Sequence, residues 1–160
     1  MLIIRDERDA LSRYLTLSDL KQAAEIYQIS FDEPWGEASL RSLLNTTGCF
    51  GIGYFEKTKT NHLMAGFILC RTLFDEAEII TFAVHPNYRG QAIGKKILSD
   101  THKTVKSRNC TTIFLEVSEK NKTALNLYSK CGYKHISTRK NYYKTANGPV
   151  NAYVMQHNLT

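Results

Sequence analysis

The hydrophobic positions of the chain alternate between short β-like runs and longer helical stripes. Strand-like runs alternate apolar and polar residues or are rich in β-branched side chains, whereas helical stripes repeat their apolar residues every three or four positions. Gly132 closes the last helical stripe, a position typical of a glycine after a helix. The expected strands are 13–17, 50–57, 63–73, 76–84, 111–118, 133–135 and 150–155, and the expected helices are 20–31, 37–45, 93–108 and 121–131.

This order of elements, β-α-α-β-β-β-α-β-α-β-β, predicts an α/β protein with a mixed sheet. The early strands should be antiparallel, and right-handed crossovers should join the strands in the middle. With 160 residues the chain is long enough to bury one self-sufficient core. We therefore expect a single domain over 1–160, in which 1–11 form an N-terminal extension.

Composition bears on location and redox state. No apolar run approaches the roughly 18 residues that a membrane span needs, and the charged opening at residues 5–9 has no apolar stretch behind it to serve as a signal peptide. We therefore expect a soluble cytoplasmic protein. The four cysteines form no C-x-x-C pair, which indicates reduced thiols and no metal site. Cys131, beside Gly132, is the one alternative nucleophile, and no pattern supports it.

Charge divides the chain into two unlike halves. Residues 1–80 carry 8 Lys and Arg against 12 Asp and Glu, a net of −4, whereas residues 81–160 carry 13 against 3, a net of +10. A basic half suits nucleic acid or any polyphosphate ligand, and an acidic half suits a cationic one. Solvated surface is the alternative for any single charge.

The segment from Val84 to Gly94 (VHPNYRGQAIG) is the most informative in the chain. A strand ends there at a proline, passes through a turn of small residues and enters an amphipathic helix. Such a helix N-terminus presents unpaired backbone N–H groups and the positive end of the helix dipole, which together bind phosphate oxygens. Lys95 and Lys96 would face the bound polyanion. A plain strand–helix connection is the alternative. A Walker loop is excluded, because no G-x-x-x-x-G-K-S/T occurs, and the G-x-G-x-x-G fingerprint is absent as well.

Two further residues carry possible chemistry. Glu116 lies inside a strand, where a carboxylate is costly unless it is solvated or paired, so it marks either a cleft or a salt bridge. Tyr128 lies on the apolar stripe of a helix, where a tyrosine is more often a core residue with a hydrogen-bonded hydroxyl.

These segments resemble the GCN5-related N-acetyltransferases, the GNAT superfamily. The run Arg89–Gly94 looks like their Arg/Gln-x-x-Gly-x-Gly/Ala pyrophosphate loop, and 121–133 resembles their N-x-x-A-x-x-L-Y-x-x-x-G-F/Y motif. The resemblance covers the chain from Arg13 on. It implies a mixed, centrally splayed sheet of six to seven strands with about four helices.

A narrower resemblance is to the bacterial ribosomal-protein-alanine N-acetyltransferases. It is carried by Pro34-Trp35 with Glu37, by Leu115-Glu116-Val117, and by Arg139-Lys-Asn-Tyr-Tyr143 with Gly148 beyond it. Those enzymes acetylate the N-terminal alanine of a small-subunit ribosomal protein with acetyl-CoA. The partner implied is therefore the N-terminal peptide of a ribosomal protein, with no direct nucleic acid and no membrane, and the enzyme would be a monomer or weak dimer.

The resemblance implies roles residue by residue. Glu116 would be the general base and Tyr128 the general acid, and CoA would leave as product. Strand residues 82–84 would offer backbone groups to the acetyl and pantetheine portions, and the turn would take the pyrophosphate. The implied cofactor-binding residues are Phe82, Ala83, Val84, Arg89, Gly90, Gln91, Ala92, Ile93, Gly94, Lys95 and Asn121.

Substrate-binding residues are expected in two segments. Asp32, Glu33 and Glu37 flank Trp35 in what should be a mobile loop able to receive a cationic peptide end; the alternative is an ordinary acidic loop with a packed tryptophan. Tyr142 and Tyr143 can wall the same groove or simply pack. His85 is an alternative base, although its place beside Pro86 favours a loop edge.

The sequence departs from these family patterns at three places. Ala92 replaces the usual first glycine of the pyrophosphate loop, and we predict a negative φ there, because a left-handed alanine would be strained and would crowd the phosphate. Gly36 stands in place of a usual serine, and Val150-Asn151 in place of acidic residues. The rival functions are acetylation of a small amine or a lysine side chain, a non-catalytic CoA-binding regulator, and a nucleic-acid-binding module.

Overall fold

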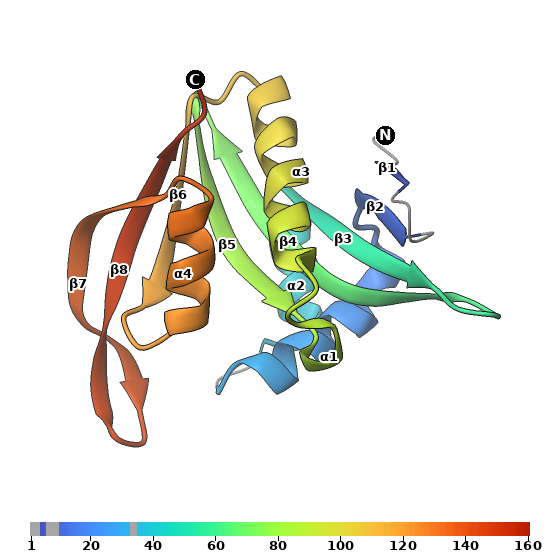
Figure 1. The fold of residues 1–160 in the computed structure, drawn as a ribbon, viewed down its shortest axis with the longest axis horizontal. Coiled ribbons are helices and arrows are strands. Elements are labelled where there is room, and N and C mark those ends of the chain that lie inside the picture. Colours follow the sequence, from blue (N-terminus) through green and yellow to red (C-terminus); the bar gives the residue numbers. More distant parts are fainter. Residues whose placement is uncertain (1–3, 6–9, 33–34) are drawn as a thin grey trace.

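The computed structural model describes residues 4–5, 10–32 and 35–160, and its centre is one mixed β-sheet (Figure 1). The strand order is β1-β2-β3-β4-β5-β6-β8-β7, and only β5 and β6 run parallel to each other. The strands are β1 Ile4–Arg5, β2 Ala10–Tyr14, β3 Cys49–Lys57, β4 His62–Leu73, β5 Glu76–Val84, β6 Thr112–Ser118, β7 Lys134–Thr145 and β8 Gly148–Asn158. Seven strands were expected, and the two-residue β1 is added to them.

Four α-helices cover the two faces of this sheet. They are α1 Leu20–Ser30, α2 Glu37–Leu44, α3 Ile93–Ser107 and α4 Lys122–Lys130, with short 3-10 helices at Leu17–Asp19 and Pro86–Tyr88. Figure 1 shows α3 and α4 lying over one face, with α1 and α2 on the other. The predicted element order and fold class are confirmed. None of these helices is long and apolar enough to cross a membrane.

Each face of the sheet has its own hydrophobic core, and β4 contributes to both. Phe67 and Leu69 pack with residues of α1 and α2, whereas Ile68 and Cys70 pack with residues of α3 and α4. Successive side chains of a strand point to opposite faces, so a strand between two layers of helices must be apolar throughout. The run from Met64 to Cys70 is accordingly buried at every position.

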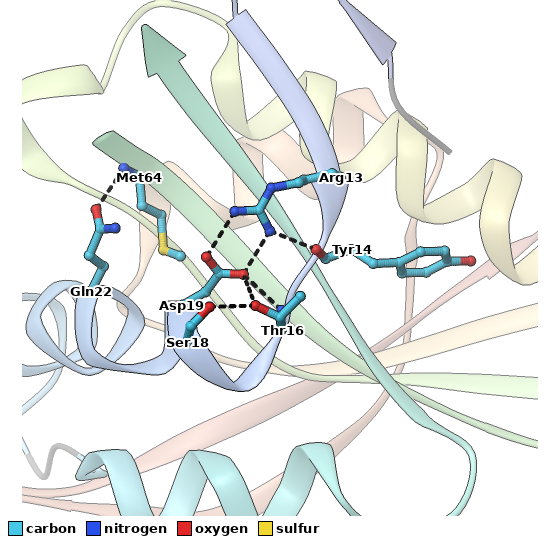
Figure 2. A network of polar contacts seen from close by, with 7 residues as sticks. All are labelled: Arg13, Tyr14, Thr16, Ser18, Asp19, Gln22 and Met64. Atoms are coloured by element: carbon cyan, nitrogen blue, oxygen red, sulfur yellow. Dashed lines mark hydrogen bonds and ion pairs between the residues drawn. The ribbon is translucent and has the colours of Figure 1, made fainter. Parts of the chain in front are cut away.

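The junction of β2, α1 and β4 is fixed by polar contacts (Figure 2). Arg13 donates from both terminal nitrogens to Asp19, at 2.7 and 2.9 Å, and the Thr16 N–H donates to Asp19 Oδ2 at 2.7 Å. Burial alone would raise the pKa of Asp19, but these hydrogen bonds outweigh it and lower the pKa. Gln22 Oε1 accepts from the Met64 N–H at 3.0 Å. Because Thr16 turns the chain into the 3-10 helix, the first strand ends at Tyr14 and lies three residues before the expected 13–17.

Other differences from the sequence expectations lie at the two ends of the chain. Residues 10 and 11 of the expected extension pair with β3, whereas residues 1–3 and 6–9 lie outside the described part. The same holds for Glu33 and Pro34, so the acidic loop around Trp35 is described only in part. The C-terminal strands are longer than the expected 133–135 and 150–155, because β7 is exposed along almost its whole length and carries no apolar alternation to reveal it.

Candidate active site

The sheet opens between β5 and β6. Their parallel pairing covers only Glu76–Glu78 against Thr112–Phe114, whereas β5 pairs with β4 up to Val84 and β6 pairs with β8 up to Ser118. The two strands therefore diverge toward their C-terminal ends, as Figure 1 shows. The predicted central splay is confirmed. Phe82, Ala83 and Val84 lie on the β5 side of this opening, beyond the last residue that pairs with β6.

The turn that follows β5 is shaped by two left-handed residues. Gly90 has a φ of +75° and Ala92 a φ of +61°, and Ala92 is the N-cap of α3. Among the described residues no side chain caps this helix, since its N-cap is an alanine, and the first intrahelical bond runs from the Lys96 N–H to the Ala92 carbonyl at 3.1 Å. The N–H groups of the first helical turn are thus left without a side-chain acceptor, which is the arrangement that receives phosphate oxygens.

The prediction of a negative φ at Ala92 is wrong, so the expected crowding of the phosphate by the alanine methyl applies to this turn and counts against intact cofactor binding. The chain must reverse between the 3-10 helix at Pro86–Tyr88 and α3, and the reversal places its left-handed residues at Gly90 and Ala92. Alternation between left- and right-handed backbone is also what aims successive N–H groups at one anion. For alanine this conformation costs about 1–2 kcal/mol, a strain that glycine avoids.

Three predicted cofactor residues have clear structural roles of their own. Arg89 donates from Nε to the Val84 carbonyl at 3.2 Å, and Gln91 donates from Nε2 to the Asn87 carbonyl at 3.4 Å, so both side chains brace the turn. Gly94 allows α3 to approach α4, since a Cβ there would lie 3.2 Å from Leu127 Cδ2.

Asn121 caps α4 on the other side of the opening. Its Oδ1 accepts from the Ala124 N–H at 3.1 Å. The cap occupies the acceptor of this amide, so a contact with a cofactor would be made by Nδ2.

Glu116 lies near the end of β6, and its side chain is 25% exposed. Arg139 of β7 donates from Nη1 to Glu116 Oε1 at 2.6 Å. Both sequence interpretations of this carboxylate therefore apply, because it borders the opening of the sheet and it also has a salt-bridge partner.

Tyr128 of α4 is buried beside the same opening. Its ring centroid lies 6.3 Å from that of Phe82 and 5.5 Å from that of Tyr133. Burial, with Tyr143 nearby, raises the pKa of Tyr128 well above its ordinary value. The phenol is therefore protonated at any physiological pH and can act as a donor.

Tyr143 links the candidate catalytic residues to the expected substrate residues. Burial, with the electrostatic influence of Glu116, Tyr142 and Tyr27, raises the pKa of Tyr143 to about 12. The Tyr142 and Tyr143 rings meet edge to face at 5.0 Å. Trp35 stacks on Tyr27 at 5.2 Å with nearly parallel planes. Tyr143 of β7 thus lies close enough to both Glu116 and Tyr27 to feel their charge, and Tyr27 in turn carries Trp35.

Glu37 is not brought into this group by any contact of the described residues. It forms an exposed i,i+4 ion pair with Arg41 at 3.1 Å. It also borders a surface hollow of about 560 Å³ along the outer side of α2, where it is the one predicted site residue among the lining residues. Its predicted substrate role therefore rests on the sequence alone.

The two alternative catalytic residues fit poorly. His85 Nδ1 accepts from the Asn87 N–H at 3.1 Å, so this nitrogen braces the turn. Burial raises the pKa of the Cys131 thiol, only partly opposed by Lys95, which disfavours the thiolate that a nucleophile needs. All four cysteines are free thiols.

Sequence reasoning assigned no role to Arg139 or Tyr27. Arg139 lies in the segment 139–143, which carried the narrower resemblance. The pattern that could have pointed to it is a cation close to two tyrosines in a segment without apolar alternation. Tyr27 gave no signal, because it falls on the apolar stripe of α1.

Comparison with known proteins agrees with this architecture. A model described as the acetyltransferase (GNAT) family matches residues 20–133. The ribosomal protein bS18-alanine N-acetyltransferase of Haemophilus influenzae is 36% identical over 138 residues, which cover 86% of this chain and 90% of the relative. The crystal structure of the ribosomal-protein-S18-alanine N-acetyltransferase from Escherichia coli has a TM-score of 0.86 at 28% identity and 94% coverage of both chains. Arabidopsis thaliana NAA60 in complex with acetyl-CoA, at 16% identity, covers 93% of this chain and 98% of its own with a TM-score of 0.81, and so shares the fold.

The fold is that of an N-acyltransferase. The chain belongs to the acetyltransferase (GNAT) family, and it is an acetyl-CoA-dependent N-acetyltransferase. The resemblance drawn from the sequence motifs is confirmed.

Proposed function

We propose that this enzyme transfers acetyl from acetyl-CoA to the α-amino group of an N-terminal alanine in a ribosomal protein of the cytoplasm. The observation that carries the proposal is the opening between β5 and β6, which has Glu116 on one strand and the phosphate-binding turn after the other. The names of relatives that share about a third of the residues support the acceptor.

The residues present fit the acetyl-CoA cofactor. The uncapped start of α3 and the left-handed Gly90 and Ala92 form the cradle for the pyrophosphate, with Lys95 in the first helical turn as a positive neighbour. The N–H and C=O groups of Phe82–Val84, on the side away from β4, are the ones able to pair with the pantetheine arm. Bound acetyl-CoA would supply the thioester, whose carbonyl the β5 N–H groups would polarise.

The acceptor amine must lose a proton before it attacks. A peptide α-amine with a pKa of about 7.7–8.0 needs about 1 kcal/mol of help at pH 7, whereas a lysine at about 10.4 needs roughly 4–5 kcal/mol. Glu116, a partly exposed carboxylate acting through a water, suits the smaller demand. Catalysis by one carboxylate, Glu116, therefore favours an α-amine over a lysine side chain.

Tyr128 would return a proton to the departing thiolate. Its raised pKa keeps the donor protonated but also makes it a weak acid, so transfer must accompany cleavage of the C–S bond. Trp35, Tyr142 and Tyr143 would wall the groove that holds the acceptor peptide, and Glu37 would attract its cationic end.

The test uses acetyl-CoA with peptides that differ only in their first residue or in a blocked N-terminus. We expect acetylation of the free alanine peptide, none of the blocked peptide, and a kcat lowered about 10²–10⁴-fold in Glu116→Gln. Equal rates with a lysine side chain or a small amine would overturn the acceptor assignment. CoA binding without turnover would indicate a regulator instead.

A further inference from the structure

We propose that Arg139 is a positioning residue for this reaction, which holds the Glu116 carboxylate with one oxygen engaged and the other facing the acceptor amine. The inference rests on the proposed role of Glu116 as the base. It concerns a side chain from β7, an edge strand that does not itself border the opening between β5 and β6.

The contact between the two side chains is one-sided. Arg139 Nη1 lies 2.6 Å from Glu116 Oε1, and within the described residues Oε2 has no hydrogen-bond partner. A guanidinium that only neutralised a carboxylate would gain most by binding both oxygens. Here one oxygen is held and the other is left to accept a proton.

The guanidinium is itself held from a second side. Its central carbon lies 4.1 Å from the centroid of the Tyr142 ring, and the Tyr142 ring packs edge to face on Tyr143. Stacking and the ion pair together restrict a long, flexible side chain to one orientation. The Tyr142 ring is therefore partly covered by Arg139, in addition to any contact that it makes with peptide.

β7 has two register shifts. The first, between His135 and Ser137, puts Arg139 on the same face of the sheet as Glu116, and the second is a bulge that begins directly after Arg139. The register passes from Arg139 opposite Ala152 to Tyr143 opposite Val150, so three residues of β7 oppose one of β8. Bulges of this kind re-aim side chains and are frequent beside active sites.

The bulge is anchored to the end of β6 by a short polar chain. Asn141, with a φ of +56°, donates its N–H to Asn151 Oδ1 at 2.9 Å. Asn151 donates its own N–H to Glu119 Oε1 at 3.2 Å, and the Glu119 N–H donates to the Asn151 carbonyl at 3.0 Å. Glu119 comes directly after β6, the strand that carries Glu116. The polar chain therefore fixes the bulge next to Arg139 to the same strand that positions Glu116.

Folding stability does not explain why Arg139 is paired with Glu116 beside a bulge in β7. The Arg139 side chain is 51% exposed and that of Glu116 25% exposed. Ion pairs that are open to water contribute about 0–1 kcal/mol. The interrupted ladder between Arg139 and Tyr143 is unfavourable by itself, and its place next to the partner of Glu116 points to a role in the reaction.

The first experiment measures steady-state kinetics of Arg139→Met, Arg139→Lys and Lys140→Met with the alanine peptide. We expect Arg139→Met to lower kcat about 10–100-fold, because a misplaced base loses its alignment. The KM for acetyl-CoA should stay within twofold. Arg139→Lys should restore part of the rate, and Lys140→Met, which removes the same charge from the next residue of β7, should have kcat unchanged. A kcat that is unaffected in Arg139→Met, or lowered equally in Lys140→Met, would overturn the proposal.

A double-mutant cycle separates positioning from a direct contact with the peptide. If Arg139 acts through Glu116, adding Arg139→Met to Glu116→Gln should lower the rate by less than about twofold. Additive losses would show that Arg139 acts elsewhere. If Glu116→Gln alone kept full activity, the proposed catalytic role would fail instead, so the two failures are distinguishable.

A third variant tests the anchor at a distance from the ion pair. Asn151→Ala removes the acceptor that holds Asn141, and we expect a smaller loss of kcat, about 3–10-fold, that does not add to the loss in Arg139→Met. Circular dichroism and the melting temperature would verify that the hairpin remains folded. Additivity between Asn151→Ala and Arg139→Met would contradict the role of the bulge.

Discussion

Two strands of the same sheet, β4 and β7, each have twelve residues and opposite surroundings. β4 lies between β3 and β5 and has seven consecutive buried residues, whereas β7 pairs only with β8 and has none. β4 therefore contributes mainly to the free energy of folding. β7 buries too little apolar surface to contribute much to the free energy of folding. Its side chains Arg139, Tyr142 and Tyr143 instead reach the region of Glu116. The difference shows that in this fold a central strand supplies stability, whereas the edge strand β7 supplies contacts to the site.

The largest expected effect is a change in stability confined to β4. Phe67 is fully buried, and Phe67→Ala should lower the free energy of unfolding by about 3–5 kcal/mol. Ile136 of β7 is 51% exposed, and Ile136→Ala should change it by less than about 0.5 kcal/mol. Urea denaturation followed by circular dichroism measures both. Similar losses of unfolding free energy in the two variants would mean that β7 stabilises the fold as strongly as β4 does.

The same contrast explains what the sequence could predict. The helices, β3, β4 and β5 follow from apolar periodicity because their environment is a packed core on at least one face. The parting of β5 and β6 came from the family motifs, since no local pattern records where a parallel ladder ends. The length of β7, the ion pair of Glu116 with Arg139 and the left-handed Ala92 depend on register and on backbone angles that composition does not encode.

The second prediction compares two buried tyrosines at the junction of α4 with β7. Tyr128→Phe removes the proposed acid and should lower kcat about 10²-fold, or roughly 2.7 kcal/mol in the barrier, with little change in stability. Tyr133 is equally buried, but its hydroxyl bonds His102 Nε2 at 2.8 Å. Tyr133→Phe should cost about 1 kcal/mol of stability and leave kcat within twofold. Equal kcat values for Tyr128→Phe and the wild type would remove Tyr128 from the mechanism.

The third prediction concerns the pH dependence of folding stability, through His102 on the buried side of α3. Burial, with His157 nearby, lowers the pKa of His102 to about 4. An unfolded histidine titrates near 6.5, so between these values the unfolded chain binds more protons and the folded state loses stability as the pH falls. We expect the free energy of unfolding to decline from about pH 6.5 to about pH 4.

A matched pair of histidine variants tests whether His102 causes this decline in the free energy of unfolding. His102→Gln should flatten it, because glutamine cannot be protonated and can still accept from Tyr133. His135 of β7 is exposed and bonds Thr138 Oγ1 at 2.9 Å, and His135→Gln serves as the matched surface control. Denaturant titrations at several pH values measure both, and a slope that persists in His102→Gln would place its origin elsewhere.

The smallest expected effect lies in the turn between β5 and α3. Ala92→Gly relieves a left-handed alanine and should raise the free energy of unfolding by about 1 kcal/mol, whereas Ala124→Gly, inside α4, should lower it by about 0.5–1 kcal/mol. CoA binding, followed as a shift in melting temperature, should be at least as strong in Ala92→Gly, because removing the methyl leaves the backbone N–H groups in place and clears space for the pyrophosphate. Weaker binding in Ala92→Gly would mean that the alanine is needed to hold the turn in its binding conformation, and that the strain is offset by rigidity.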